Sequence, residues 1–403
     1  MSVLSGKKIL LGITAGIAAY KTASLVRLFI KLGADVKVIM TPASKDFITP
    51  LTLSTLSKNP VHSTFFDKEE ENEVWNNHVD LGLWADYFLI APATANTLSK
   101  MANGVCDNLL LATYLSAKCP VYFAPAMDLD MYIHPSTKES LEKLHFFGNL
   151  LIPAASGELA SGLVGEGRMT EPQDIVTFIE NDIVLKLPLR GKKVLVTAGP
   201  TYEAIDPVRF IGNHSSGKMG FAIANVAANL GAEVILISGP SHQQIKHSFV
   251  KRIDVVSADE MYKVAHQYFN EVDIAILSAA VADYKPKNVA NHKIKKKDSS
   301  LMMELTPTKD ILASLGEIKK HQFLVGFALE TNNEIENAQS KIRRKNLDAI
   351  ILNSLQDKGA GFATNTNKIT IIDKNFNEKP FELKSKLAVA EDILSEIILR
   401  TKK

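Results

Sequence analysis

The amino-acid sequence predicts an α/β protein built of two doubly wound, Rossmann-like domains with mainly parallel sheets. Three observations support this prediction. The chain has 403 residues, which is too long for one ordinary domain. Short apolar runs alternate with helical patterns, as β-α-β units require. One pattern of strand, glycine turn and helix also occurs twice, about 185 residues apart. We therefore expect domains at residues 1–188 and 189–403.

The first copy of this pattern lies at the N-terminus. It predicts a strand over Lys8–Ile13, a turn, a helix that ends near Leu32, and a second strand over Asp35–Met40. Two later apolar runs, Ala85–Ala91 and Val121–Ala124, predict further strands, each followed by a loop that contains proline. Parallel strands separated by helices follow from this order.

The second copy begins after the segment 187–191, where we place the domain boundary. It predicts strands over Lys192–Thr197 and Ala232–Ser238 with a helix between them.

Two other segments are rich in glycine or lysine. The stretch Gly157–Arg168 predicts an irregular loop, of the kind that is usually functional or mobile. The lysine-rich stretch Asn288–Ser300 is either an exposed loop or a lid over a phosphate-bearing ligand.

Composition and cysteine usage restrict the class of protein. The chain is 46% hydrophobic and 22% charged, as in soluble globular proteins. Its two cysteines, Cys106 and Cys119, make a disulfide scaffold implausible and fit a reducing compartment. The lysines before Ile9–Tyr20 resemble the start of a signal peptide, but the same run predicts a buried strand, a turn and a helix start. We favour the second interpretation and expect a cytoplasmic protein without a membrane span.

The net charge of +2 is unevenly distributed. Residues 1–188 carry a net charge of −5, whereas residues 189–403 carry +7. A basic second half fits a polyanionic small ligand such as a nucleoside triphosphate, although a solvated lysine-rich surface explains it equally well. The basic residues are not interleaved with stacking aromatic residues, so nucleic-acid binding is not expected.

The first glycine turn is a candidate phosphate site. Gly12, Thr14 and Gly16 lie where a strand passes into a helix, and the backbone amides of such a turn bind phosphate. The dinucleotide fingerprint is incomplete, because its third glycine and its acidic residue are missing. Thr41 ends the second strand with a hydroxyl group instead, which favours a mononucleotide.

Two other segments of the first half carry candidate functional groups. Thr94 and Asn96 follow a strand among small residues, and they can cap a helix, line a ligand site, or do both. His78 stands shortly before Trp84 and Asp86. A single histidine is more often structural than catalytic, so His78 gains weight only from its neighbours in the sequence.

Together these segments resemble the homo-oligomeric flavin-containing cysteine decarboxylases over residues 7–180. The matching pieces are the turn at 12–16, His78 before Trp84, the loop 91–97, the segment 125–127 and the flap 157–169. The resemblance implies a flavoprotein decarboxylase fold, bound FMN and a catalytic role for His78. FMN would supply the electron sink that a cysteine-derived carboxylate lacks. The implied FMN residues are Gly12, Thr14, Gly16, Thr41, Thr94, Asn96 and Met127.

Two implied catalytic positions depart from this family's usual pattern. Asp128 stands where asparagine is usual, and Ser161 stands where the flap usually carries a cysteine. The asparagine would bind the substrate carboxylate, and the cysteine would donate a proton during the final reduction. Serine is a much weaker acid than a thiol. We interpret the pair as a coordinated lineage variant that keeps decarboxylation; a flavin-binding scaffold domain is the alternative.

The second half is similar to the phosphopantothenate–cysteine ligase domain, from Gly191 to about Asn353. The Ser-Ser-Gly-Lys stretch at 215–218 is not a P-loop, because the first glycine of that motif is missing at the required spacing. The resemblance implies a ligase fold in which Asn213 is catalytic, Arg209 and Asn213 bind substrate, and Lys293 contacts the triphosphate. The implied CTP residues are Ala279, Asp283, Lys293, Lys309, Asp310, Ile311, Leu312, Phe327, Lys341 and Lys345.

The order of the two domains resembles the fused bacterial enzymes of coenzyme A synthesis. That resemblance implies CTP-dependent ligation of cysteine to 4′-phosphopantothenate through an acyl-cytidylate, followed by FMN-dependent decarboxylation of 4′-phosphopantothenoylcysteine to 4′-phosphopantetheine. A divalent ion, Mg²⁺, would assist CTP, with ligands that the sequence does not identify. A trimer-based homo-oligomer, such as a dodecamer, is also implied. A nicotinamide oxidoreductase is disfavoured by the incomplete fingerprint.

Overall fold

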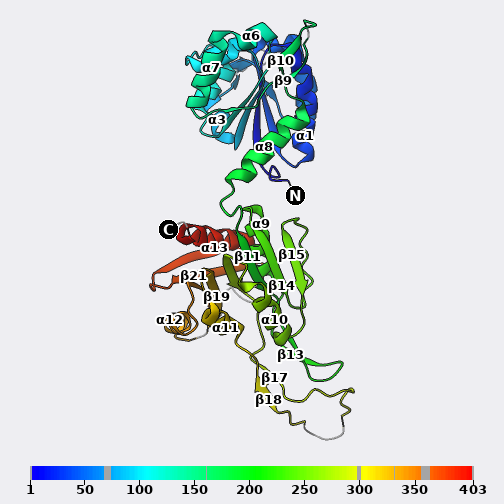
Figure 1. Cartoon of the computed structure of the whole chain (residues 1–403), viewed down its shortest axis with the longest axis vertical. Coiled ribbons are helices and arrows are strands. Elements are labelled where there is room, and N and C mark those ends of the chain that lie inside the picture. The colour runs from blue at the N-terminus through cyan, green and yellow to red at the C-terminus, as the bar shows by residue number, and fades with distance from the viewer. Residues whose placement is uncertain are drawn as a thin grey trace. The chain divides into compact units, whose positions relative to one another are not determined.

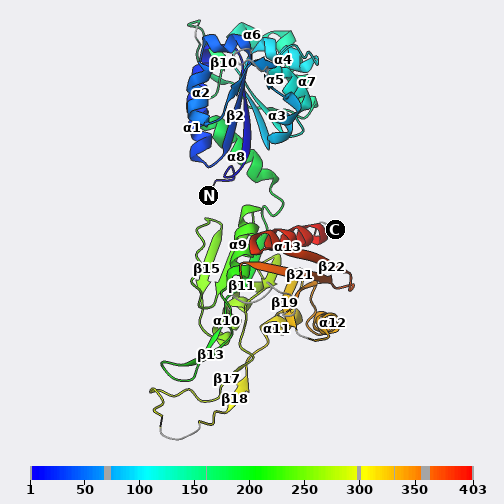
Figure 2. The same ribbon diagram turned by 180° about the vertical axis from the view of Figure 1, so that it is seen from behind.

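The computed structural model describes residues 2–67, 74–159, 161–296, 301–330, 332–354 and 364–401. It divides into two compact units, Met1–Leu185 and Lys186–Lys403, here called the front unit and the back unit. Figures 1 and 2 show both from opposite sides. Each unit has its own mainly parallel sheet with helices on both faces, which confirms the predicted α/β class. Ala160 of the flap and residues 297–300 of the lysine-rich loop lie outside the described residues.

The front unit is built around a six-stranded parallel sheet with the order β3-β2-β1-β6-β7-β8. The order reverses between β1 and β6, and in open α/β sheets a ligand site forms at that point, beyond the carboxyl ends of the strands. Two short antiparallel pairs, β4–β5 and β9–β10, lie outside this sheet. The strands are β1 (Lys8–Ile13), β2 (Asp35–Met40), β3 (Val61–His62), β4 (Phe66–Asp67), β5 (Val74–Trp75), β6 (Tyr87–Ala93), β7 (Val121–Pro125), β8 (Leu150–Leu151), β9 (Ala155–Glu158) and β10 (Val164–Arg168).

Two apolar cores fix the helices to the front sheet. One core joins the sheet to η1 (Ile17–Lys21), α1 (Thr22–Lys31), α2 (Pro50–Ser57) and α8 (Pro172–Lys186). The other joins the opposite face to α3 (His78–Trp84), α4 (Ala95–Ala102), α5 (Leu109–Ser116), α6 (Leu129–Ile133) and α7 (Pro135–Phe146). The short η2 (Pro42–Asp46) follows β2. Burial on both faces explains why β1 and β6 read as continuous apolar runs.

The back unit contains an eight-stranded sheet with the order β15-β14-β11-β16-β19-β20-β21-β22. The first six strands are parallel, and the last two are antiparallel. Helices α9 and α13 share one apolar core with the sheet, and α10, α11 and α12 share the other. The helices are α9 (Lys218–Asn229), α10 (Ala258–Phe269), α11 (Ile311–Ile318), α12 (Glu334–Arg344) and α13 (Lys386–Thr401).

Two short hairpins of the back unit, β12–β13 and β17–β18, contact one another and extend away from the sheet (Figures 1 and 2). They carry the segments that surround Arg209, Asp283 and Lys293. The strands are β11 (Lys193–Ala198), β12 (Tyr202–Ala204), β13 (Phe210–Gly212), β14 (Glu233–Ser238), β15 (Val250–Asp254), β16 (Ile274–Leu277), β17 (Tyr284–Pro286), β18 (Leu305–Pro307), β19 (Phe323–Glu330), β20 (Ala349–Ser354), β21 (Thr366–Asp373) and β22 (Glu378–Ser385).

The predicted strands agree with the structure to within two residues, and one predicted loop is wrong. The first helix begins with the 3-10 turn η1 before it becomes α1. The glycine-rich flap is not irregular, because β9 and β10 pair as an antiparallel hairpin. Gly167 adopts φ +137° there, and a Cβ at this position would lie 2.4 Å from the Met127 carbonyl oxygen. The glycines therefore allow close approach of two backbones, a requirement that glycine content alone does not distinguish from a flexible loop.

Candidate functional sites

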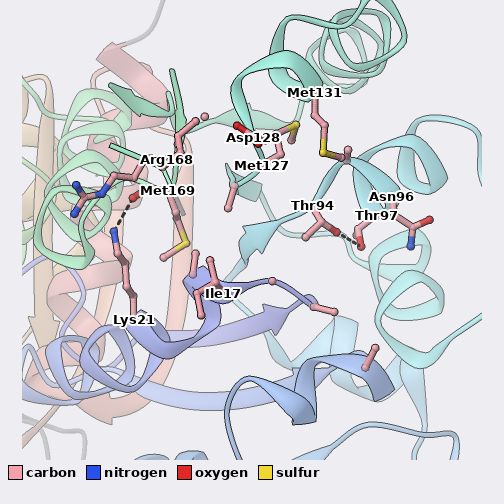
Figure 3. A pocket seen from close by; sticks show the side chains of 18 of the residues that line it. Ile17, Lys21, Thr94, Asn96, Thr97, Met127, Asp128, Met131, Arg168 and Met169 are labelled. Atoms are coloured by element: carbon pink, nitrogen blue, oxygen red, sulfur yellow. Dashed lines mark hydrogen bonds between the residues drawn. The ribbon is translucent and has the colours of Figure 1, made fainter. Parts of the chain in front are cut away.

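The front unit contains a cavity of about 910 Å³ at the carboxyl ends of β1, β2, β6 and β7. This volume lies in the range of about 300–1,000 Å³ that is typical of small-molecule sites. Figure 3 shows labelled side chains that line the cavity, including Lys21, Thr94, Met127 and Met169. The lining includes five predicted FMN residues and both departing catalytic positions, namely Gly16, Thr41, Thr94, Asn96, Met127, Asp128 and Ser161.

Two features of the cavity lining are hydrogen-bonding groups that the described residues leave available to a ligand. The buried Oγ1 of Thr41 has no hydrogen-bond partner among the described residues. Thr94 precedes the first turn of α4 without capping it through its side chain. Uncapped amides at a helix start favour an anion, and an unpartnered buried hydroxyl is costly unless a ligand uses it. These two features therefore fit a ligand that carries a phosphate group.

Two of the predicted FMN residues lie behind this surface and do not line the cavity. Gly12 packs tightly against side chains of the core, because a Cβ at this position would lie 3.1 Å from both Leu110 and Phe88. Thr14 is buried; its hydroxyl donates to the Pro92 carbonyl oxygen at 2.6 Å and accepts from the Thr94 amide at 3.2 Å. Thr14 thus positions the loop that carries Thr94, while Gly12 allows close packing behind it.

The two positions that depart from the decarboxylase pattern contact one another. Oδ1 of Asp128 accepts a hydrogen bond from the Leu129 amide at 2.7 Å, which caps α6. The same oxygen accepts from the Ser161 hydroxyl at 3.0 Å. The Met127 amide donates to the Gly167 carbonyl oxygen at 3.0 Å, so the flap meets the β7–α6 turn at two places. The flap thereby forms one wall of the cavity.

A charged group at the base of the flap was missed by the sequence analysis. Lys21 is only 6% exposed, lines the cavity, and donates to the Met169 carbonyl oxygen at 3.0 Å and to Glu171 at 2.8 Å (Figure 3). Arg168 also donates to Glu171 at 2.8 Å. The hydrogen bond from Lys21 holds the pKa of Glu171 below its usual value. The signal in the sequence was a lysine at a helical position that should be apolar.

His78 does not line the cavity of its own chain. It is the first residue of α3, which Asn77 caps by accepting from the Val79 amide at 3.0 Å. Its Nδ1 is buried and has no partner among the described residues. The rings of Phe65 and Trp75 contact its imidazole edge-on, with centroids 6.1 and 6.2 Å away.

The surface around His78 exposes an unusual number of large apolar side chains. Phe66, Trp75, Val79 and Leu83 are 48%, 53%, 41% and 55% exposed, respectively. Exposed apolar side chains that cluster in this way mark interaction surfaces more often than scattered ones do.

The back unit contains a smaller cavity of about 160 Å³. Two predicted CTP residues, Ala279 and Phe327, line it. The predicted catalytic Asn213 lies beside it, because its Nδ2 donates to the carbonyl oxygens of Ala280 (3.3 Å) and Val281 (3.0 Å). The lining also contains Ser215, Ser216 and Lys218 of the stretch that is not a P-loop, and three polar residues that the sequence analysis missed, Asn353, Asn367 and Lys386. Their distance from one another along the chain explains this.

Other predicted CTP residues lie outside the lining of this cavity and form ion pairs. Lys345 contacts Asp310 at 2.8 Å, and Lys341 contacts Glu330 at 2.5 Å. Partial burial acts to raise the pKa of Asp310, but hydrogen bonds from Lys345 and the Ala313 amide outweigh it and lower that pKa. Asp310 also caps α11.

The remaining predicted nucleotide residues have different surroundings. The Lys309 ammonium lies 4.6 Å from the centroid of the Tyr262 ring. Ile311 is buried in the core, and Leu312 packs against it, so their side chains are structural. Asp283 and Lys293 are exposed.

Arg209 is held in place by a buried carboxylate. It donates to Asp206 through Nε (3.0 Å) and Nη2 (2.6 Å), and Nη2 also donates to the Ile294 carbonyl oxygen at 2.6 Å. Burial acts to raise the pKa of Asp206, but hydrogen bonds from the Val208 amide and Arg209 hold it far below the usual value. The guanidinium group therefore links β13 to the lysine-rich loop that contains Lys293.

The described residues offer no evident set of metal ligands. The described residues contain no cluster of three or more histidine, cysteine, aspartate or glutamate side chains that could bind an ion. No helix within the described ranges combines the length and apolarity that crossing a membrane requires.

Comparisons with known proteins match both halves of the chain. Residues 2–184 match the family described as "Flavoprotein", and residues 189–400 match "DNA/pantothenate metabolism flavoprotein C-terminal domain". The chain is 44% identical to the "Coenzyme A biosynthesis bifunctional protein CoaBC" of Bacillus subtilis over 402 residues, which cover 99% of this chain and 98% of that protein.

Two further relatives match large parts of the chain. A "Cysteine/Cysteine sulfinic acid decarboxylase" of an unknown prokaryotic organism is 56% identical over 356 residues, which cover 87% of this chain and 99% of that protein. A crystal structure of the C-terminal domain of a CoaBC protein is 44% identical and covers 54% of this chain and 99% of that one, with a TM-score of 0.47.

Proposed function

The chain belongs to the family of bifunctional coenzyme A biosynthesis proteins, and we propose from this premise how each unit acts. It is an enzyme with a decarboxylase half and a ligase half. In our proposal the back unit joins cysteine to 4′-phosphopantothenate with CTP, through an acyl-cytidylate. The front unit then decarboxylates 4′-phosphopantothenoylcysteine to 4′-phosphopantetheine.

The front cavity supports FMN as its cofactor. Its volume suits a mononucleotide, and its lining contains both the unpartnered hydroxyl of Thr41 and the start of α4, which Thr94 does not cap. In this proposal Thr41, Thr94 and Asn96 hold the phosphate end, while Met127 packs against the ring. Bound FMN would accept the electrons that leave the substrate thiol, so that the carboxylate can depart. The protein binds the substrate, excludes water and supplies protons.

The flap and Asp128 close over the reacting end of the substrate. Ser161 and Asp128 share a hydrogen bond, so the substrate meets a joined pair at these two positions. We propose that the pair replaces the asparagine and cysteine of related decarboxylases as one unit. The alternative, a flavin-binding scaffold domain, would keep the same cavity, and release of carbon dioxide distinguishes it from an active decarboxylase.

His78 would act in a neighbouring copy of the chain. Its absence from the lining of its own cavity and the apolar surface around it support this proposal. Association through Phe66, Trp75, Val79 and Leu83 would bury that surface and bring His78 to a second cavity. A homo-oligomer based on trimers is the arrangement we propose, working in the cytoplasm.

For the ligase, we propose that Arg209, Asn213 and Lys293 contact the acyl-cytidylate and its phosphates. Lys341 and Lys345 would help to hold CTP. No cluster of acidic groups is present in the described residues, so Mg²⁺ would be bound mainly through the triphosphate, as is common for this ion. Positive charge from the lysines would stabilise the pyrophosphate that leaves.

A second candidate substrate for the front unit is free cysteine. It is favoured by the 56% identity to a protein named as a decarboxylase of cysteine and cysteine sulfinic acid. Free cysteine carries an ammonium group that the Asp128 carboxylate would attract, whereas the amide nitrogen of an acylated cysteine carries no charge.

The deciding experiment is mass spectrometry of the products from 4′-phosphopantothenate, cysteine, CTP and Mg²⁺. We expect 4′-phosphopantetheine. Accumulated 4′-phosphopantothenoylcysteine would contradict the proposed decarboxylation, and a product two hydrogens lighter than phosphopantetheine would place the defect in the final reduction. A parallel reaction with cysteine alone tests the second candidate, because only that activity would release cysteamine.

A further inference from the structure

Asp128 uses one carboxylate oxygen within the fold and leaves the other available to a ligand of the front cavity. Its Oδ1 accepts hydrogen bonds from the Leu129 amide at 2.7 Å and from the Ser161 hydroxyl at 3.0 Å. A carboxylate oxygen has two lone pairs, so both are occupied at Oδ1. No hydrogen bond to Oδ2 is found within the described residues, and Asp128 lines the cavity (Figure 3). A proton taken up by Asp128 therefore lies on Oδ2.

The cations of this cavity do not neutralise Asp128. Lys21 and Arg168 line the cavity, but both form ion pairs with Glu171 at 2.8 Å. Asp128 has no ion-pair partner in the part of the chain that the structure describes. The flap adds a further carboxylate to the lining at Glu158. The negative charge of Asp128 is thus balanced only by neutral hydrogen-bond donors.

Charged groups on the neighbouring elements interact with other partners. Helix α6 packs against β10 and α7. Burial and the Glu166 charge raise the pKa of Tyr132, and the Lys138 ammonium lies 4.5 Å from the centroid of the same ring. Asp130, on α6 itself, is exposed. None of these groups supplies a positive charge to Asp128.

A substrate that brings a carboxylate to Asp128 brings a second negative charge. Two carboxylates at contact distance do not both stay ionised when the nearby cations are already paired, so they share one proton. In the proposed reaction, 4′-phosphopantothenoylcysteine places its carboxylate at this position. Because both lone pairs of Oδ1 are occupied, the shared proton lies between Oδ2 and the substrate carboxylate. Substrate binding therefore loads Asp128 with a proton.

We propose that Asp128 is the proton donor of the final reduction and delivers from Oδ2 the proton that the substrate carboxylate brought onto it. This inference rests on the proposed decarboxylase function. It gives Asp128 the role that the resemblance to the flavin-containing decarboxylases gives to a flap cysteine. Ser161 is then a positioning residue, because its hydroxyl occupies Oδ1 and leaves Oδ2 for the substrate. The two departures from the family pattern thus form one device.

The proton is needed at the carbon that loses the carboxylate. The C–C bond to the carboxylate breaks, carbon dioxide leaves, and the electron pair stays on the substrate as an enethiolate. A C–H bond then forms between this carbon and the Oδ2 proton, and Asp128 becomes ionised again. The carbon beside the sulfur receives the hydride that reduced FMN supplies when bound. The product thiolate takes its proton from water. The donor therefore lies where the departing group has just left space.

The first test measures proton uptake in the full-length flavoenzyme without turnover. One ligand is 4′-phosphopantothenoylalanine, which has the carboxylate but no thiol to oxidise. The other is the corresponding ethylamide, which also lacks the carboxylate and so corrects for the phosphate group. Calorimetry in buffers of different ionisation enthalpy gives the number of protons bound. We expect the alanine ligand to take up about one proton more than the ethylamide in the wild type, with no such excess in Asp128→Asn. Equal uptake of the two ligands by the wild type would overturn the proposal.

The second test follows a single turnover of 4′-phosphopantothenoylcysteine by mass spectrometry. Asp128→Asn can still cap α6 and bind a carboxylate, but it has no acidic proton. We expect this variant to raise the ratio of the product two hydrogens lighter to 4′-phosphopantetheine about a hundredfold, as loss of a general acid predicts. Asp130→Asn is the matched control, because Asp130 is exposed and outside the lining, and it should give the wild-type product. Adding Ser161→Cys to Asp128→Asn should restore 4′-phosphopantetheine, since a thiol is a stronger acid than a hydroxyl.

The outcomes separate this proposal from the function on which it rests. Normal release of carbon dioxide with 4′-phosphopantetheine as the main product of Asp128→Asn would refute only the role of Asp128. Failure of the wild type to release carbon dioxide would refute the proposed decarboxylase, and the final reduction with it.

Discussion

The hydroxyl group of Ser161 donates a 3.0 Å hydrogen bond to Oδ1 of Asp128, the oxygen that also caps α6. The two residues lie 33 positions apart, and they are the two positions at which the resemblance to the flavin-containing decarboxylases implies other residue types. Their contact means that a change at either position alters the surroundings of the other. The pair also joins the flap to the turn after β7.

We expect the effects of Ser161→Ala and Asp128→Ala on decarboxylation to be strongly non-additive. Residues in direct contact usually show coupling energies of about 0.5–3 kcal/mol, so the double variant should lose less than the sum of the single losses. The single variant Asp128→Ala and the double variant both lose the α6 cap, so this loss cancels when the four proteins are compared as a double-mutant cycle. The measurement is kcat/KM for release of carbon dioxide in all four proteins; additive losses would show that the pair does not act as a unit.

Replacing Thr41 with valine should weaken FMN binding without destabilising the flavin-free protein. The buried hydroxyl has no partner among the described residues, so its removal breaks no bond in the fold. Thr14→Val is the matched control, because the buried Thr14 hydroxyl already makes hydrogen bonds with the Pro92 carbonyl oxygen and the Thr94 amide. We expect Thr41→Val to raise the Kd for FMN about tenfold, as loss of a hydrogen bond to a charged group predicts, and Thr14→Val to lower Tm instead. Fluorescence titration and calorimetry separate these outcomes; a lower Tm for flavin-free Thr41→Val would contradict the interpretation.

Two inactive variants should complement one another if His78 acts in a neighbouring copy. His78→Asn removes the imidazole, and Gly16→Glu places a carboxylate in the lining where a phosphate is proposed. Each homo-oligomer should fail to decarboxylate and should accumulate 4′-phosphopantothenoylcysteine. Co-expressed chains should regain activity, because a mixed assembly pairs an intact cavity with an intact histidine. Equal inactivity of the mixture, with co-purification of both chains shown, would place His78 in its own chain's site.

The buried Asp206 should make the stability of the back unit depend on acid pH. Its hydrogen bonds hold its pKa below the ordinary 3.8, so its stabilising effect is complete above that value and is lost progressively as the pH falls below it. Asp206→Asn should therefore lower Tm most near neutral pH, and the difference from the wild type should shrink in acid. Calorimetry of the full chain from about pH 6 to about pH 2 spans the onset of this loss, which begins near 3.8 and continues at lower pH. A Tm difference that does not change with pH would show that the carboxylate charge is not responsible.

Local patterns predicted the sheets well, because burial on both faces leaves continuous apolar runs. The order of Lys8–Ile13 and Asp35–Met40 around a glycine turn was sufficient to place β1 and β2. The prediction of an irregular flap was wrong. Glycine is found both in loose loops and where two backbones touch, and Gly167 is an example of the second case. The lining of the back cavity could not be predicted either, because residues such as Lys218 and Lys386 are far apart in the sequence. Long-range convergence of this kind leaves no periodic signal in one sequence.

The C-terminal extension of the back sheet has a consequence for how the protein is made. Strand β21 and helix α13 contain the last residues of an apolar core whose first members are Leu189 and Val194, and Val389, Ile393 and Ile397 lie in that cluster. During synthesis the front unit can fold while the chain is still growing, since domains generally fold as units as they emerge. The back unit has to wait until α13 leaves the ribosome, and its half-made sheet stays exposed until then. A premature stop before α13 should therefore cause aggregation of nascent chains before it affects either reaction.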